Sequence, residues 1–155
     1  MQSQLHLTSF TEDMRRRGMV ATTLVRRAER AVPPLDGRAA LGLPEGEQAW
    51  SIERLRLANG IPMALELGWY SPRVAEDLGE QDLSSSLYGL LADRYGVRID
   101  AAEQTVWTEA VDDAVAEPLA VVPGSPVLVF RRTSRAAGLP VEHVTSWYRG
   151  DRYQV

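Results

Sequence analysis

The chain has 155 residues, of which 45% are hydrophobic and 25% charged, which is the size and composition of one globular domain. All 17 basic residues are arginines and there is no cysteine, so lysine Schiff-base chemistry, thiolate nucleophiles, disulfides and cysteine metal sites are excluded. The formal net charge is -4 at pH 7, so the chain lacks the positive electrostatic potential that would attract nucleic acid.

Metal, cofactor and membrane signals are also missing from the sequence. His6 and His143 show no metal-ligand spacing, so we expect neither a metal nor a cofactor. The N-terminus lacks a basic start followed by an apolar run, and no window approaches the roughly 18 apolar residues that a membrane span requires. We therefore expect a cytoplasmic protein.

Capping residues, periodicity and breakers predict the elements in chain order. The capping pair Ser9 and Glu12 predicts a helix over about 9–17, and Pro33-Pro34 closes a strand over 20–32. Further elements are predicted as a brief helix at 35–41, strands at 49–58 and 61–70, one or two helical turns at 72–79, a helix at 84–95, an extended segment at 97–109, a helix at 112–121, and strands at 127–135 and 140–149. Because the late strands pair as hairpins, we expect an α+β fold with a largely antiparallel sheet.

The hairpin around Asn59-Gly60 decides which side chains share a face of the sheet. Side chains alternate between faces along a strand, and the leucines of both hairpin strands, such as Leu55 and Leu65, occupy odd positions. We therefore predict that the odd-numbered residues form the core face. A three-residue loop with glycine at the bulge position keeps odd residues opposite odd residues, and we predict that loop.

This register places two arginines and a glutamate together. Arg54, Arg56 and Glu66 then share the face away from the core, with Arg54 opposite Ala64 and Arg56 opposite Pro62. Two neighbouring guanidinium forks with small side chains beside them suit bidentate binding of phosphate or carboxylate. The alternative is a solvated face on which the arginines form surface ion pairs worth about 0–1 kcal/mol.

Two predicted helix starts offer further groups for an anion. Free N–H groups and the partial positive charge of a helix N-terminus favour anions, and such ends are expected at Phe10-Thr11 and at Ser84-Ser85-Ser86. The second start also supplies hydroxyl groups and the nearby Tyr88. The alternative reading is ordinary N-capping by serine.

The last strand adds a carboxylate and a phenol on one face. Glu142, Ser146 and Tyr148 share parity, and a buried glutamate beside a tyrosine suits sugar hydroxyls or an amide. The alternative is a cross-strand pair between Glu142 and Arg131 or Arg132.

Four segments carry a family resemblance: LTSFTEDMRRRG, RLRLANGIPMALE, SSSLY and EHVTSWYRGDRY. Together, from about Leu7 onward, they resemble the effector-sensing (UTRA) domain of HutC-type GntR transcription regulators. The resemblance implies a chorismate-lyase-like fold, in which helices flank an antiparallel sheet, and usually a homodimer. It also implies that a small metabolite alters operator binding and that DNA is contacted only through an N-terminal winged helix-turn-helix. No segment before Leu7 matches a winged helix-turn-helix, so we expect residues 1–155 to form a single effector-binding domain.

Among such domains, the pattern is most similar to regulators of N-acetylglucosamine use, which sense amino-sugar phosphates. The resemblance implies a phosphate clamp and a sugar-binding set, without any catalytic residue. The clamp would comprise Arg54, Arg56, Ser86, Tyr88 and the backbone N–H groups of Phe10 and Thr11, and the sugar and its amide would be held by Glu66, Glu142 and Tyr148.

Two other functions stay open from the sequence. The same fold hosts chorismate lyase, so an enzyme acting on a small carboxylate is the main alternative to a sensor. A sensor that binds a protein partner is the other, and it would show a large exposed apolar patch.

Overall fold

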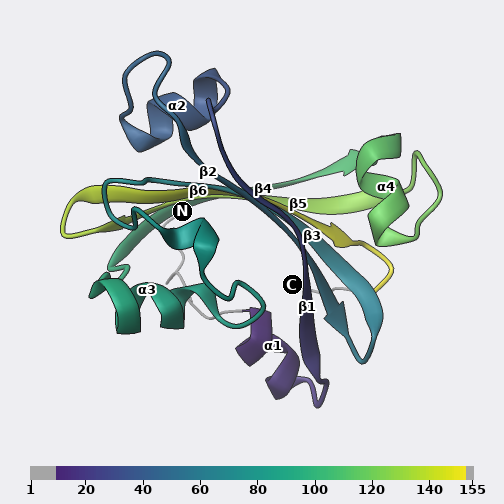
Figure 1. The fold of residues 1–155 in the computed structure, drawn as a ribbon. Helices are drawn as coiled ribbons and strands as arrows, with labels where there is room; N and C mark the ends of the chain where they lie inside the picture. The colour runs from purple at the N-terminus through teal and green to yellow at the C-terminus, as the bar shows by residue number, and fades with distance from the viewer. Residues whose placement is uncertain (1–9, 153–155) are drawn as a thin grey trace.

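The structure is a computed structural model, and it describes residues 10–152. Within this range six strands form one antiparallel sheet in the order β1-β2-β3-β6-β5-β4 (Figure 1). The strands are β1 (Ala21–Ala31), β2 (Ala49–Ala58), β3 (Ile61–Tyr70), β4 (Ala101–Ala110), β5 (Pro126–Ala136) and β6 (Leu139–Arg149). The helices are α1 (Phe10–Arg16), α2 (Leu35–Leu41), the short 3-10 helix η1 (Leu78–Glu80), α3 (Leu87–Tyr95) and α4 (Asp113–Leu119). The predicted α+β fold with a mainly antiparallel sheet is confirmed.

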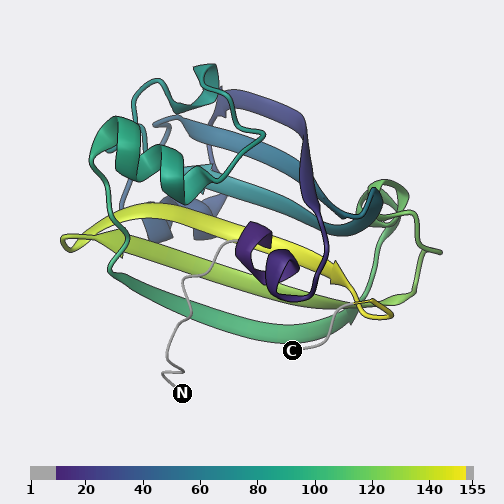
Figure 2. The same cartoon turned by 90° about the horizontal axis from the view of Figure 1, so that it is seen from below.

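Helices cover both faces of this sheet (Figures 1 and 2). On one face, α3 and η1 pack on an apolar cluster that includes Ile52 and Leu91, and α1 packs on a second cluster through Phe10 and Met14. On the other face, α4 inserts Leu119 among strand residues, and α2 closes a smaller cluster. The central strands are therefore buried on both sides.

The hairpin between β2 and β3 departs from the predicted register. Its loop has two residues, Asn59 with φ 50° and Gly60 with φ 77°, the two positive values that a type I′ turn requires. The Asn59 side chain also accepts a hydrogen bond from the Val20 backbone N–H at 2.8 Å, which favours asparagine at this position. The prediction of a three-residue loop was wrong.

A bulge in β3 then restores the parity that the two-residue loop would break. Leu57 pairs with Pro62 but Arg56 pairs with Ala64, so Met63 is an extra residue on β3. Beyond the bulge, even residues pair with even residues. Arg54 consequently lies opposite Glu66, and Arg56 lies opposite Ala64 instead of the predicted Pro62.

The prediction that these arginines face away from the core was also wrong. Arg54 is 1% exposed and Arg56 is 5% exposed, because the face on which they lie is covered by α1 and α3. The odd-numbered leucines Leu55 and Leu65 do pack in a core, but it is the core beneath α4. The sheet therefore has two buried faces, and the guanidinium groups occupy one of them.

Local signals place most element boundaries close to their predicted positions. The predicted strands at 49–58 and 61–70 coincide with β2 and β3, and α2 spans the predicted 35–41. The helix expected at 84–95 begins only at Leu87, because Ser86 is its N-cap and accepts a hydrogen bond from the Gly89 N–H at 3.2 Å. The expected cap Ser9 lies outside the described residues. Within residues 10–152, no helix is long and apolar enough to span a membrane.

Candidate functional site

The face of the sheet beneath α1 and α3 carries a cluster of charged side chains that apolar packing does not explain. Arg54 and Arg56 project from β2, and Glu66 lies opposite Arg54 on β3, within ion-pair distance of both arginines. The Arg54 Nε lies 3.8 Å from Glu66 Oε1, and the Arg56 Nη1 lies 3.4 Å from Glu66 Oε2. We use the name arginine face for the connected set of polar side chains on this side of the sheet: Arg54, Arg56, Glu66, Tyr88, Gln104, Arg132, Ser134 and Glu142.

The two β2 guanidinium groups are incompletely paired. The Nε and Nη1 of Arg54 and the Nε of Arg56 are buried and have no hydrogen-bond partner among the described residues. A buried polar group without a partner costs about 1–3 kcal/mol, and more when it is charged, so natural folds rarely leave one without a reason. Acceptor oxygens of a bound anion would satisfy these donors.

The Phe10 ring closes the α1 side of this cluster. The Arg56 Cζ lies 4.6 Å from the centre of the Phe10 ring, within the range of a cation–π contact. The same ring lies 6.3 Å from that of Tyr148, which packs edge-on against Phe130 at 5.1 Å. Helix α1 thus contacts the arginine face through the Phe10 ring.

A hydrogen-bonded chain forms the other end of the arginine face. Arg132 donates to the Tyr88 hydroxyl at 3.0 Å, and Tyr88 donates to Glu142 Oε1 at 2.6 Å. The buried Ser134 hydroxyl donates to the same Glu142 oxygen at 2.8 Å. On the edge strand, Gln104 Oε1 accepts from two nitrogens of Arg132, at 3.0 and 2.8 Å. This chain joins α3, β4, β5 and β6.

The two carboxylates have opposite electrostatic environments. Burial acts to raise the pKa of Glu66, but the nearby Arg54 and Arg56 hold it below its usual value. Burial raises the pKa of Glu142, assisted by Glu66 and only partly opposed by the bonds from Tyr88 and Ser134. Three guanidinium groups outnumber these two carboxylates, so the fully ionised arginine face carries net positive charge.

The structure brings most of the predicted site residues to one face. Arg54, Arg56, Glu66, Glu142, Tyr88, Tyr148 and Phe10 all lie on or against the sheet beneath α1 and α3. Ser86 lies one residue before α3, where its hydroxyl caps the helix. Thr11 lies in the first turn of α1, and its part in binding stays a prediction.

Three residues of the arginine face were not among the predicted ligands: Gln104, Arg132 and Ser134. Arg132 was considered only as a cross-strand partner of Glu142, whereas in the structure it reaches Tyr88 and Gln104. The pairing of Ser134 with Glu142 across β5 and β6 is a signal that could have placed Ser134 and Arg132 on this face, since they share parity.

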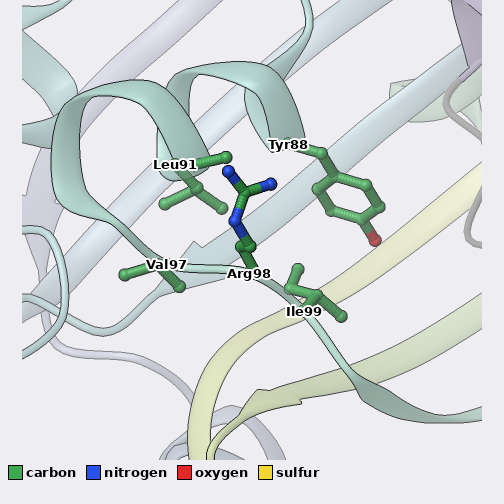
Figure 3. Close-up of a pocket in the computed structure, with 6 residues that line it drawn as sticks. Tyr88, Leu91, Val97, Arg98 and Ile99 are labelled. Atoms are coloured by element: carbon green, nitrogen blue, oxygen red, sulfur yellow. The ribbon is translucent and has the colours of Figure 1, made fainter.

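A hollow of about 210 Å³ lies beside the arginine face (Figure 3). It is lined by Tyr88, Leu91, Ala92, Val97, Arg98 and Ile99. Only Tyr88 belongs to both, and Figure 3 shows its hydroxyl directed away from the α3 backbone. Among residues 10–152, no group of three histidine, aspartate or glutamate side chains is arranged to hold a metal ion.

The opposite pKa shifts predict opposite pH dependences for two matched variants. Glu66 contributes stability that is present above its unfolded pKa and is lost as pH falls through its lowered folded pKa. Glu142 contributes stability that is present below its unfolded pKa and is lost as pH rises through its raised folded pKa. From about pH 3 to about pH 7, the free energy of unfolding relative to the wild type should therefore fall for Glu66→Gln and rise for Glu142→Gln. Urea titrations across this range measure both trends, and two trends of the same sign would contradict the assignment.

The helix-covered antiparallel sheet, with charged side chains buried on one of its faces, is the architecture with which known proteins were compared. The family model of the UTRA domain matches residues 16–154, so the chain belongs to the UTRA domain family. The resemblance to effector-sensing domains of HutC-type GntR regulators is thereby confirmed.

Relatives and solved structures agree with this family. The HTH-type transcriptional repressor NagR of Bacillus subtilis (strain 168) is 36% identical over 148 residues, which are 95% of this chain and 61% of the repressor. The chain thus spans less than two thirds of that relative. The effector domain of PhnF from Mycobacterium smegmatis has the same fold, with a TM-score of 0.89 at 24% identity over 97% of this chain and 93% of that one. The C-terminal domain of the histidine utilization repressor from Pseudomonas syringae pv. tomato str. DC3000 superimposes with a TM-score of 0.81 at 21% identity, over 87% of this chain and 95% of that one.

Proposed function

We propose that the chain is the effector-binding domain of a bacterial transcriptional regulator and that its effector is a small anionic metabolite, best matched by an amino-sugar or sugar phosphate. The observation that carries this proposal is the set of buried guanidinium N–H groups on Arg54 and Arg56 without acceptors among the described residues. A phosphate offers several acceptor oxygens, and arginine forks bind it in a bidentate manner.

The rest of the arginine face suits the neutral part of such a ligand. Glu142 on β6, two strands from β2 in the sheet order, and the Tyr88 hydroxyl of α3 bond each other, and both can bond hydroxyl or amide groups. The resemblance assigned Tyr88 to the phosphate, but because its hydroxyl bonds Arg132 and Glu142, we propose that it belongs to the sugar-binding set with Glu66, Glu142 and Tyr148. The backbone N–H groups of Phe10 and Thr11 and the hydroxyl of Ser86 complete the proposed phosphate clamp. The NagR relative, a transcriptional repressor of the helix-turn-helix type, supports a regulatory role.

Regulation requires that the effector bind two states of the regulator unequally. We propose that the ligand is held between the sheet and α1 and α3, so that binding changes how these helices pack and thereby alters operator affinity through an N-terminal DNA-binding domain in a homodimer. Moving the population from 99:1 to 1:99 requires a difference of about 5.5 kcal/mol between the two states. Several charge-assisted hydrogen bonds of about 1.5–3 kcal/mol each can supply that amount.

A thermal-shift panel tests the proposal against the enzyme alternative. The ligands are N-acetylglucosamine 6-phosphate, glucosamine 6-phosphate, unphosphorylated N-acetylglucosamine, inorganic phosphate and chorismate. A ligand present at about 100 times its Kd stabilises by about 2.7 kcal/mol, which raises the Tm by roughly 5–10 °C for a domain of this size. We expect such a rise with a sugar phosphate and none with the unphosphorylated sugar.

Two results would contradict the proposal. Equal shifts with N-acetylglucosamine and its phosphate would show that the anion is not recognised. Release of 4-hydroxybenzoate from chorismate, detected by its absorbance, would favour the chorismate-lyase-like enzyme instead.

A further inference from the structure

Arg131 and Arg132 are neighbours in β5 with opposite surroundings. Because side chains alternate along a strand, Arg131 lies on the face covered by α2 and α4, where its guanidinium stacks 5.2 Å from the Trp107 ring centre. Arg132 lies on the arginine face and bonds Tyr88 and Gln104. The two residues therefore carry the same charge one position apart, and only one of them reaches the candidate site.

Gln104 fixes the direction of the Arg132 guanidinium. Its Oε1 accepts from Nε at 3.0 Å and from Nη2 at 2.8 Å, which occupies one edge of the planar fork. The remaining Nη1 donates to the Tyr88 hydroxyl at 3.0 Å. Since the Tyr88 oxygen accepts this bond, its own proton is free for Glu142, to which it donates at 2.6 Å.

This arrangement saturates one oxygen of Glu142 and leaves the other available. Tyr88 and Ser134 both donate to Oε1, and no described residue donates to Oε2. An ionised carboxylate is an acceptor only, so the available oxygen can bond an N–H or O–H group of a ligand. A protonated Glu142 would lose part of this accepting capacity.

We propose that Arg132, held by Gln104, is a positioning residue that directs the Tyr88 proton to Glu142 and keeps Glu142 an ionised acceptor for an amide or hydroxyl group of the effector. The inference rests on the proposed function. It divides the site into an anion-binding end at β2 and an end at β5 and β6 where Glu142 accepts hydrogen bonds from N–H or O–H groups of the ligand. Inorganic phosphate reaches only the anion-binding end, so its affinity should not depend on Arg132.

The charges around Glu142 agree in direction with this role. Glu66 and Tyr70 from β3 and Tyr88 from α3 surround the carboxylate, and the burial that raises its pKa is opposed by Arg132. Removing the Arg132 charge therefore raises the pKa of Glu142 further. In that variant Glu142 takes up its proton at a higher pH than in the wild type.

The decisive comparison is between Arg132→Met and its neighbour Arg131→Met, which loses the same charge on the opposite face. Calorimetric titrations use N-acetylglucosamine 6-phosphate and inorganic phosphate as separate probes. We expect Arg132→Met to weaken sugar-phosphate binding about tenfold or more while inorganic phosphate stays within about twofold, and Arg131→Met to change neither. Arg132→Lys should recover part of the loss because it retains the charge. Equal sugar-phosphate affinities in the two methionine variants would overturn the proposal, as would equal losses for both probes.

A ligand-free readout separates this inference from the proposed function. Carboxyl-carbon NMR of Glu142 follows its protonation with pH in the domain alone, so a failure of the wild type to bind sugar phosphates does not affect it. We expect the Glu142 pKa to rise in Arg132→Met but not in Arg131→Met, and an unchanged value would overturn the proposal. If Arg132→Met does not fold, Gln104→Met frees the guanidinium without removing its charge and should also weaken sugar-phosphate binding selectively. Unchanged binding in Gln104→Met would overturn the proposal as well.

Discussion

Replacing Arg54 by methionine is expected to weaken sugar-phosphate binding roughly a hundredfold, since about 3 kcal/mol of charge-assisted hydrogen bonding is lost. Arg54 is 1% exposed, and two of its nitrogens have no acceptor among the described residues, so a bound anion is the partner that would satisfy them. The same variant should be less stable than the wild type in the absence of ligand. The loss of Arg54 leaves the buried Glu66 carboxylate without the guanidinium that does most to hold its pKa low, so affinity is measured at a temperature where the variant is folded.

The control for this prediction is Arg73→Met. Arg73 forms an exposed ion pair with Glu47 at 2.8 Å, and its loss changes the net charge by the same amount. Sugar-phosphate affinity, measured by calorimetry, and Tm without ligand should both stay near the wild-type values. If Arg54→Met bound as tightly as Arg73→Met, the guanidinium would not be part of the binding site.

Leu91→Ala is expected to reduce the free energy of unfolding by about 2–5 kcal/mol, the usual cost of the cavity that is left when a buried leucine is truncated to alanine. Leu91 is 1% exposed and belongs to the cluster by which α3 packs on the sheet. Because α3 also carries Tyr88, a loosened helix should weaken sugar-phosphate binding as well. Urea unfolding measures the stability, and calorimetry under native conditions measures the affinity.

Leu119→Ala is the matched control on the opposite face. Leu119 is 0% exposed and anchors α4 in the cluster that contains Leu55 and Leu65. The loss of stability should be similar, whereas the affinity of the folded domain for a sugar phosphate should change little. Equal losses of affinity in Leu91→Ala and Leu119→Ala would indicate that α3 has no special role in the site.

Local signals were sufficient for the hairpin strands but not for their register. Asn59-Gly60 predicted a hairpin, and the strands on either side of it have the predicted limits. The extra residue Met63 has no sequence signal of its own, because a bulge is fixed by how β3 pairs with neighbours distant in sequence. The parity of Arg54 and Glu66 was still predicted correctly, since the observed loop and bulge together preserve it.

The arginines of β2 were easier to predict than the other residues of the site. Alternation within β2 placed Arg54 and Arg56 together, but it could not show that helices cover both faces of the sheet. Arg132 and Gln104 lie on β5 and β4, whose parity relative to β2 depends on pairings across the whole sheet. Such long-range pairings are decided by tertiary packing, so a pattern in one segment does not reveal them.

The most direct test of the anion site is an NMR titration of the arginine Nε–H groups with inorganic phosphate and N-acetylglucosamine 6-phosphate. The Nε–H signals of Arg54 and Arg56 should shift in a saturable manner as they gain acceptors. Those of Arg149, whose Nε already bonds Asp151, and of Arg73, whose guanidinium pairs with Glu47 through Nη2 at an exposed position, should stay in place. Signals of Arg54 and Arg56 that remain unchanged at saturating sugar phosphate would contradict an anion site on this face of the sheet.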